Sequence, residues 1–295
     1  MSEQRGATMI ATPAEPLILP APAKLNRMLH IIGRRPDGYH ELQTLFQFLD
    51  HGDTLHVRRR QDGDIRLTPA LAGVAEEENL VLRAARLLQA ESRCRLGADI
   101  HLEKRLPLGG GLGGGSSDAA TALLGLDALW GVGLSLDRLA ELGLRLGADV
   151  PVFVRGHAAW GEGVGERLIP VELDTPWFVV VHPGVAVSTP AVFGAGELTR
   201  HTPPITIARA LQGGASGWRN DCEATVRALY PPVADVLDWL STRAPAMLTG
   251  TGACVFARLA SEADADRLLA EIAGRWQAFK ARGLNRSPLH DVLGR

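Results

Sequence analysis

Residues 106–120, LPLGGGLGGGSSDAA, place six glycines and two serines in one short segment. Glycine loses more conformational freedom on folding than any other residue, so this segment strongly constrains the structure around it. Three interpretations compete. The segment is a flexible linker, a dinucleotide-binding turn, because Gly109, Gly111 and Gly114 form a G-x-G-x-x-G pattern, or a cradle that presents backbone N–H groups to phosphates.

The neighbouring residues argue against the first two interpretations. A linker joins independent units, whereas this loop precedes residues 119–130, AATALLGLDALW, which are apolar nearly all round and predict a buried helix. A dinucleotide-binding turn follows a strand that is apolar on both faces, but the HLEKR segment before this loop is charged. The acidic residue at the required distance, Asp137, falls in the first turn of a predicted helix.

The third interpretation remains, in which successive N–H donors and the N-terminus of the following helix bind an anion. A Cβ in the loop would hold phosphates away from these donors, which explains the glycines. A P-loop has a lysine after its last glycine, whereas here Gly115 is followed by Ser116 and Ser117. Ser116, Ser117 and Asp118 are competent N-caps. The serines alternatively bind a phosphate or help to hold Mg²⁺, and the pattern does not separate these roles.

Composition and cysteine usage limit the functional classes. The 295 residues carry a formal net charge of −2, which offers no general attraction to nucleic acid or to an anionic membrane. The three cysteines are far apart and lack C-x-x-C spacing, which argues against a disulfide framework and a zinc site. No apolar run reaches the ~18–20 residues that span a bilayer. We expect a cytoplasmic protein with no obligatory protein partner and a loosely ordered tail over residues 1–16.

The hydrophobic pattern predicts alternating strands and helices. TLFQFL, DTLHVRRR and DIRLTP, within residues 44–69, predict successive antiparallel strands, of which the last two form an exposed hairpin. Asn79 and Ser135 predict the N-caps of two helices. Residues 147–166 predict a turn and a strand. In the second half, strands and helices form an α+β layer with a last helix over Ser261–Lys280.

If the loop binds phosphates, a transfer enzyme also needs a cation and a carboxylate near it. The cation opposes the charge on the migrating group, and the carboxylate orients and deprotonates the acceptor. Lys24 is one of only three lysines among 31 basic residues, and its PAKLN segment is an apolar place for an ammonium. Asp149, in GADVP, follows the end of a predicted helix. By its spacing alone, Asp149 is equally interpreted as a turn residue before proline.

These segments together resemble the GHMP kinase superfamily. The resemblance rests on PAKLN, LPLGGGLGGGSSDAA, LGADVPVF and LTGTGACVF in that order and covers the chain from about Pro20 to the final NRSPLHDVL. It implies an α+β fold of two domains. Residues 17–168 would be an ATP-binding domain of the ribosomal-protein-S5 domain 2-like type, and residues 169–295 a ferredoxin-like α+β substrate domain. ATP is the implied co-substrate, Mg²⁺ is expected with it, and no residue is assigned as a metal ligand.

Two further segments resemble a narrower branch of this superfamily. RPDGYHELQTLFQFLD and GADVPVFVRGHAAWGEGVGE are similar to kinases whose substrate is a methylerythritol that carries a cytidine diphosphate group, in the non-mevalonate route to isoprenoids. The resemblance implies that the C2 hydroxyl of this substrate is phosphorylated. Another small alcohol is the nearest alternative substrate. A dinucleotide-binding oxidoreductase and a catalytically silent nucleotide-binding module are the alternatives from other classes.

The resemblance also implies roles for individual residues. Asp149 would be the general base, and Lys24 would lie beside it and stabilise the transferred phosphoryl group. Tyr39 and His40 would hold the cytosine ring, Phe193 would be its second stacking face, and Asn26 would contact the substrate near the reacting end. The phosphates of ATP would be surrounded by Pro107, Leu108, Gly109, Gly110, Gly111, Leu112, Gly113, Gly114, Gly115, Ser116 and Ser117. The LTGTGACVF segment is either a glycine turn near the phosphates or a plain tight turn.

Overall fold

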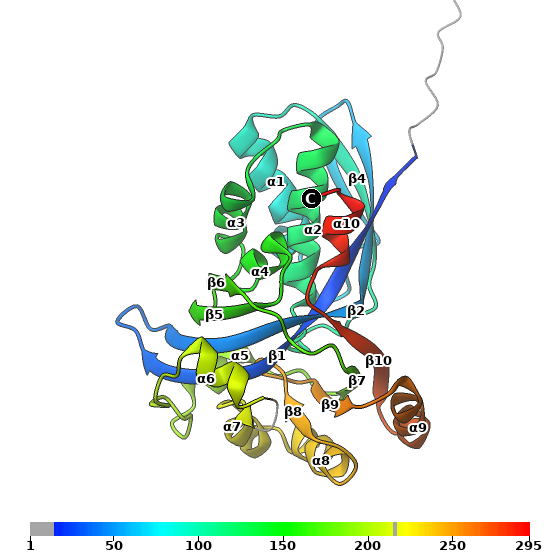
Figure 1. Ribbon diagram of the computed structural model, residues 1–295. Helices are drawn as coiled ribbons and strands as arrows, with labels where there is room; N and C mark the ends of the chain where they lie inside the picture. The colour runs from blue at the N-terminus through cyan, green and yellow to red at the C-terminus, as the bar shows by residue number, and fades with distance from the viewer. Residues whose placement is uncertain (1–14, 215–216) are drawn as a thin grey trace, which may run out of the picture.

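The computed structural model describes residues 15–214 and 217–295 (Figure 1). Of the tail expected over residues 1–16, residues 1–14 lie outside the described part of the chain. Two groups of elements lie one above the other in Figure 1. The upper group, here called the N-terminal lobe, comes mainly from the first half of the chain. The lower group, the C-terminal lobe, comes mainly from the second half.

A long antiparallel ribbon connects the two lobes. It consists of β1 (Leu17–Arg34) and β2 (His40–Arg60), which pair from Leu17↔Val57 to Arg34↔His40. TLFQFL and DTLHVRRR were predicted as two strands, but both belong to β2, because β1 provides a partner for β2 between His40 and Val57. The ribbon contributes to both hydrophobic cores: Leu19 packs in the core of the N-terminal lobe and Ile31 in that of the C-terminal lobe.

The predicted hairpin after β2 is wrong. β4 (Gly97–Glu103) lies between β2 and β3 (Ile65–Thr68), and it pairs antiparallel with β2 and parallel with β3. Between β3 and β4 the chain passes through η1 (Glu76–Glu78) and α1 (Leu80–Ser92). Parallel strands need such a crossover, which a two-residue turn does not provide. As predicted, Asn79 caps α1, where its side chain accepts a hydrogen bond from the Val81 N–H.

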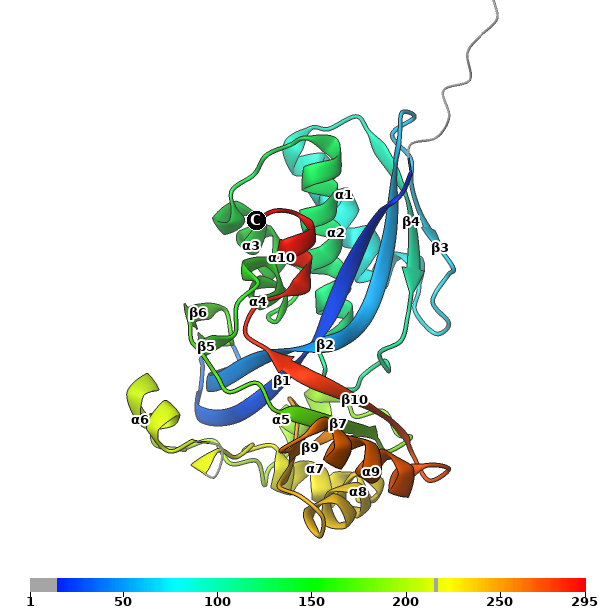
Figure 2. The ribbon, with the colours of Figure 1, turned by 45° about the vertical axis from the view of Figure 1, so that its right-hand side comes forward.

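Helices cover one face of this sheet (Figure 2). They are α1, α2 (Gly114–Trp130), α3 (Leu136–Leu144) and α4 (Val150–Arg155). Ser135 caps α3, as predicted. The N-cap of α2 is Gly113, so Ser116, Ser117 and Asp118 lie inside the helix and the prediction that one of them caps it is wrong. The strand predicted within residues 147–166 is present at residues 159–163, but the prediction missed α4 before it, where Pro151 occupies the first turn and a missing N–H costs nothing.

The C-terminal lobe contains an antiparallel sheet in the order β10-β7-β9-β8, with helices between its strands in the chain. This is a β-α-β-β-α-β arrangement, which is ferredoxin-like. The strands are β7 (Trp177–His182), β8 (Ala246–Leu248), β9 (Val255–Leu259) and β10 (Gln277–Leu284). The helices are α5 (Thr189–Gly194), α6 (Ile207–Gln212), α7 (Glu223–Leu229), α8 (Pro231–Ser241) and α9 (Glu262–Ile272).

The end of the chain ties the lobes together. The helix predicted over Ser261–Lys280 ends at Ile272, and β10 follows, because it finds partners in β7 and, at Gly283 and Leu284, in β2. α10 (Pro288–Val292) then returns to the N-terminal lobe beside α2 (Figures 1 and 2). β5 (Ala159–Gly163) pairs with β2 and β6 (Arg167–Pro170). Within the described residues, every helix is too short or too polar to cross a membrane.

Candidate active site

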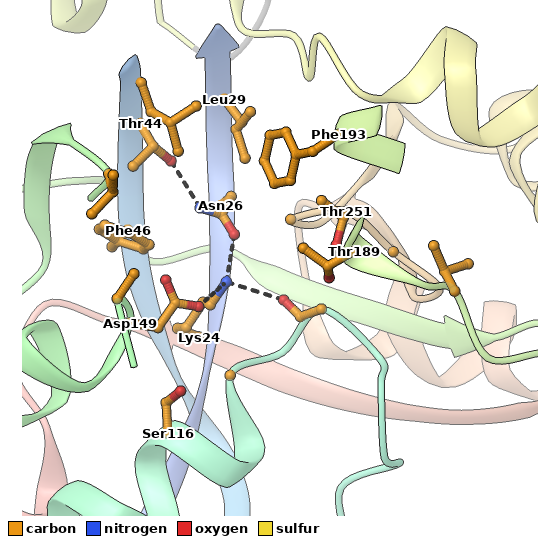
Figure 3. A pocket seen from close by; sticks show the side chains of 18 of the residues that line it. Lys24, Asn26, Leu29, Thr44, Phe46, Ser116, Asp149, Thr189, Phe193 and Thr251 are labelled. Carbon is orange, nitrogen blue, oxygen red and sulfur yellow. Dashed lines mark hydrogen bonds and ion pairs between the residues drawn. The ribbon is translucent and has the colours of Figure 1, made fainter. Parts of the chain in front are cut away.

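A cavity of about 320 Å³ lies where the ribbon, the glycine-rich loop and the C-terminal lobe meet (Figure 3). This volume is at the lower end of the range for small-molecule sites. Lys24 and Asn26 come from the ribbon, and Asp149 directly precedes α4. The glycine-rich loop, the turn before β9 and the start of α5 also line the cavity. The predicted catalytic pair therefore faces the predicted phosphate loop across one cavity.

Lys24 is almost completely buried, with 2% of its surface exposed. A buried ammonium is costly unless its donors are satisfied. Its Nζ lies 3.1 Å from Asp149 Oδ2, and it donates to Asn26 Oδ1 at 2.5 Å and to the Gly111 carbonyl at 3.1 Å (Figure 3). Its position is thus fixed by the ribbon, by the start of α4 and by the loop at the same time.

Asn26 is held in one orientation by its neighbours. Its Nδ2 donates to Thr44 Oγ1 at 2.8 Å, and that hydroxyl donates to the Met28 carbonyl at 2.6 Å. Because the amide nitrogen is used in this way, Oδ1 is the atom that faces Lys24. The Asn26 N–H donates to Thr249 Oγ1 at 3.0 Å, which ties the strand to the turn before β9.

Asp149 keeps one oxygen available. Its side chain is 33% exposed toward the cavity, and Oδ2 pairs with Lys24. Within residues 15–214 and 217–295, Oδ1 accepts no hydrogen bond from the protein. Although Asp149 occupies the N-cap position of α4, its side chain does not cap the helix. One oxygen is thus positioned by a cation while the other is free to accept a hydrogen bond from a ligand.

The glycine-rich loop has its carbonyl groups tied to the protein. The Gly109 and Gly110 carbonyls accept from the Ala253 and Cys254 N–H groups at 3.1 and 3.0 Å. The Leu112 carbonyl accepts from the Lys24 N–H at 2.9 Å. In contrast, the N–H groups of residues 108–116 donate to no acceptor in the part of the chain that the structure describes. A row of unpaired amides at the start of a helix is an anion-binding arrangement.

The glycines of the loop are required for two different reasons. Gly109, Gly111 and Gly113 have φ angles of 67°, 73° and 70°, a region that other residues rarely adopt. A Cβ on Gly111 would lie 2.3 Å from the Thr249 carbonyl oxygen, and one on Gly113 would lie 2.8 Å from the Phe153 ring. A Cβ on Gly109 would meet nothing within 4 Å. The packing of the protein itself therefore demands two of these glycines, and Gly109 faces open space.

A second cavity, of about 550 Å³, adjoins the first and shares Leu42 and Phe193 with it. It is lined by Tyr39, His40 and Phe193, so the structure brings together the three residues predicted to hold a cytosine ring. Tyr39 is 64% exposed, and the rings of His40 and Phe193 stack on each other with centroids 4.8 Å apart. The role of Phe193 as a second stacking face for the base stays a prediction.

Comparison with known proteins agrees with this geometry. Residues 79–157 match the family model described as GHMP kinases N terminal domain, and residues 205–278 match GHMP kinases C terminal. The chain is 69% identical over 281 residues, 94% of each chain, to 4-diphosphocytidyl-2-C-methyl-D-erythritol kinase from Chromohalobacter salexigens. The chain belongs to the GHMP kinase family. It is also 60% identical, over 94% of each chain, to the protein of the same name from Ectopseudomonas mendocina.

Solved structures confirm the predicted two-domain α+β fold of a GHMP kinase. A crystal structure of 4-(cytidine 5'-diphospho)-2C-methyl-D-erythritol kinase matches with a TM-score of 0.80 and 35% identity, covering 90% of this chain and 98% of that one. A crystal structure of mevalonate kinase matches with a TM-score of 0.68 and 16% identity, over 92% and 100% of the two chains. The second likeness concerns the fold alone.

The turn before β9 contacts the glycine-rich loop of this GHMP kinase. Besides the bonds from Ala253 and Cys254, Thr249 Oγ1 donates to the Gly111 carbonyl at 3.3 Å. Of the two interpretations of LTGTGACVF, the structure thus favours the turn near the predicted phosphate site. Burial raises the pKa of the Cys254 thiol to about 12, so Cys254 packs under the loop as a small apolar group and is no nucleophile.

Sequence reasoning missed a buried ion cluster beneath the loop. Lys104 Nζ lies 2.5 Å from Asp53 Oδ2 and 2.7 Å from Asp118 Oδ2. Asp53 Oδ1 accepts from the Arg105 and Leu106 N–H groups at 2.6 and 2.8 Å. Burial raises the pKa of Asp118 to about 7, against the attraction of Lys104, which lowers it. The cluster fixes the segment that enters the loop relative to α2. The only signal in the sequence was the rarity of lysine.

Proposed function

We propose that this GHMP kinase transfers the γ-phosphoryl group of ATP to the C2 hydroxyl of 4-diphosphocytidyl-2-C-methyl-D-erythritol. The observation that carries the chemistry is the pairing of Lys24 with Asp149 across from a loop whose amides are free and whose carbonyls are tied to the protein. The substrate is that named for relatives at 56–69% identity over 94% of this chain. The second cavity, lined by Tyr39 and His40, supports the same substrate.

The transfer follows from where these groups lie. The free amides of residues 108–116 and the N-terminus of α2 hold the β- and γ-phosphates. The free oxygen of Asp149 accepts the hydrogen bond of the C2 hydroxyl and aims its oxygen at the γ-phosphorus. The C2 oxygen then bonds to phosphorus, the bond to the β–γ bridging oxygen breaks, and ADP leaves. The hydroxyl proton passes to Asp149 late in the reaction, while Lys24 stabilises the charge on the phosphoryl group.

Mg²⁺ is expected to enter with the phosphates of ATP. The first cavity contains one carboxylate, Asp149, which already pairs with Lys24, and the described residues hold no group of three or more His, Cys, Asp or Glu suited to a metal. Mg²⁺ is commonly held by substrate phosphates, waters and one or two protein oxygens. The Ser116 hydroxyl faces this cavity and would supply such an oxygen (Figure 3). The ion would neutralise phosphate charge.

The remaining assignments extend the proposal to the substrate. Tyr39, His40 and Phe193 contact the cytosine ring, and Asn26, which lines the first cavity, contacts the methylerythritol end. We also propose that the ATP-binding and substrate-binding domains meet near residues 168 and 169. A cytoplasmic location and the absence of an obligatory protein partner stay predictions.

Measured ADP formation with different acceptors tests this function. With saturating ATP, we expect kcat/KM for the cytidyl substrate to exceed the values for mevalonate and homoserine by at least ~10²-fold, because a site that hydrogen-bonds a base rejects ligands without one. Comparable or faster turnover of mevalonate or homoserine would contradict the substrate assignment. No ADP formation with any acceptor would support a silent binding module, and an absorbance change of a nicotinamide cofactor would support an oxidoreductase.

A further inference from the structure

Arg200 joins the two walls of the second cavity. It lies in the segment after α5, where its Nη2 donates to the carbonyls of Phe193 and Ala195 at 2.9 and 2.6 Å and its Nη1 to that of Leu198 at 3.1 Å. Its Nε donates to His40 Nε2, at the start of β2, at 3.1 Å. Within the described residues no carboxylate pairs with Arg200. Its charge is therefore directed at carbonyl groups and at one imidazole.

This contact determines which nitrogen of His40 carries a proton. A guanidinium only donates hydrogen bonds and stays charged at every physiological pH. His40 Nε2 therefore accepts with its lone pair, and the proton of the neutral ring lies on Nδ1. Burial, followed by the charges of Arg200 and Arg34, lowers the pKa of His40 and disfavours the doubly protonated ring. His40 is 6% exposed, and the stacked Phe193 ring restricts its rotation.

The Nδ1–H group remains available to a ligand. His40 lines the second cavity, and its Nδ1 has no hydrogen-bond partner in the part of the chain that the structure describes. Because His40 Nδ1 lacks a partner among these residues without being fully buried, it is open to the cavity or to solvent. With its tautomer fixed by Arg200, His40 offers a ligand in the cavity a hydrogen-bond donor and no acceptor.

We propose that Arg200 is a positioning and specificity-determining residue, which holds His40 as the neutral Nδ1–H donor and so selects a pyrimidine that presents a ring acceptor. Cytosine N3 is an acceptor, whereas uracil N3 carries a hydrogen and would place a donor against a donor. Two buried donors that face each other both lack an acceptor, which weakens binding. This inference rests on the proposed function and adds to it how the cavity distinguishes a cytidine diphosphate group from a uridine diphosphate group.

NMR of the full-length enzyme tests the tautomer directly. In protein labelled with ¹⁵N-histidine, the His40 signals, assigned by their loss in His40→Gln, are expected to show a protonated Nδ1 and an unprotonated Nε2. In Arg200→Met the ring is expected to move toward the Nε2–H form, which free imidazole side chains prefer. A protonated Nε2 in the wild-type enzyme overturns the proposal, and this measurement needs no variant of Arg200 to fold.

Arg34→Met is the matched control. Arg34 lines the same cavity and lowers the pKa of His40 through its charge, but it donates no hydrogen bond to His40. Removing it takes away a similar charge and leaves the Arg200 contact in place. We expect the Nδ1–H tautomer to persist in this variant. An equal change of tautomer in both variants would show that charge, and not the hydrogen bond, sets the proton position.

Steady-state kinetics test the consequence. Arg200→Met is expected to raise KM for the cytidyl substrate at least ~10-fold, with kcat and KM for ATP changed less than ~3-fold, because uniform binding is lost. Its preference for the cytidyl substrate over the uridine analogue is expected to fall at least ~10-fold, and Arg200→Lys to restore part of it. Unchanged preference in a folded Arg200→Met variant overturns the inference. Failure of the wild-type enzyme to use the cytidyl substrate would instead refute the proposed function.

Discussion

In the proposed reaction, Lys24 supplies a positive charge and Asp149 supplies a base. The ammonium is buried against Asn26 Oδ1 and the Gly111 carbonyl, so it is a fixed positive charge in a place with little water. Electrostatic interactions in such a place are stronger than in bulk water. Asp149 is partly exposed, so the substrate hydroxyl of the proposed reaction would reach its free oxygen from the cavity. The Lys24 ammonium is therefore preorganised, while the Asp149 carboxylate remains accessible.

We predict that Lys24→Met and Asp149→Asn each lower kcat by at least ~10²-fold, because each variant removes a charge used in the transition state and keeps the shape of the side chain. Steady-state ADP release with the cytidyl substrate measures the loss. Lys280→Met is the control, since Lys280 pairs with Glu262 and Asp266 on the surface of the C-terminal lobe. A folded variant of Lys24 or Asp149 that keeps kcat within ~3-fold of the wild type would refute the role of that residue.

At the scale of elements, the glycine-rich loop is bonded to the rest of the described chain through its carbonyl groups and not through its amides. Its carbonyls bond to Lys24 and to the turn before β9, and its amides point to no protein acceptor among the described residues. The ion cluster around Lys104 holds the segment that enters the loop, and the burial of α2 holds the segment that leaves it. Both ends of the loop are thus rigid before a ligand arrives, which lowers the entropic cost of binding.

Gly109→Ala separates ligand contact from backbone strain. Gly109 has a φ of 67°, Gly131 at the end of α2 has a φ of 68°, and a Cβ on either would meet nothing within 4 Å. Alanine at either position is expected to lower the free energy of unfolding by about 1–2 kcal/mol, measured by urea denaturation. Only Gly109→Ala is expected to raise KM for ATP, by at least ~10-fold. An equal effect of both variants on KM would contradict the contact between Gly109 and the phosphates.

The elements that were predicted correctly carry their signals locally. Asn79 and Ser135 cap the helices that follow them, and no distant residue is needed for this. The helix predicted over Ser261–Lys280 extends too far because residues 277–282 pair with β7, about a hundred residues earlier, and such long-range pairing overrides local preference. The helix α4 within residues 147–166 was missed for a local reason, since Pro151 begins a helix as readily as it ends one.

Some residues of the candidate site were predicted from the sequence, and others were not. The glycines, Lys24 and Asp149 were predicted to lie in one site because phosphate transfer demands those residue types and because the segments resemble a known family, and the structure places them around one cavity. The Lys104 cluster and the contact between Arg200 and His40 were not found. Their partners are 51 and 160 residues apart in the sequence, and a side-chain contact of that kind leaves no periodicity or spacing to detect.

On the scale of the whole molecule, the β1–β2 ribbon connects both cavities to both lobes. Lys24 and Asn26 lie along β1, and His40 begins β2 at the turn end of the ribbon. Leu29 and Ile31 pack into the core of the C-terminal lobe, and the pairing of β10 with β2 joins the two sheets. In the proposed function, a base near His40 and a γ-phosphate near Lys24 would thus be positioned by one continuous element.

A crystal structure with a non-hydrolysable ATP analogue and the cytidyl substrate tests the central claim most directly. We expect oxygens of the β- and γ-phosphates to lie within hydrogen-bond distance of amides in residues 108–116. We also expect the C2 hydroxyl to lie between Asp149 and the γ-phosphorus, with Lys24 beside that phosphate. Phosphates bound away from these amides, or a γ-phosphate remote from Lys24 and Asp149, would contradict this claim.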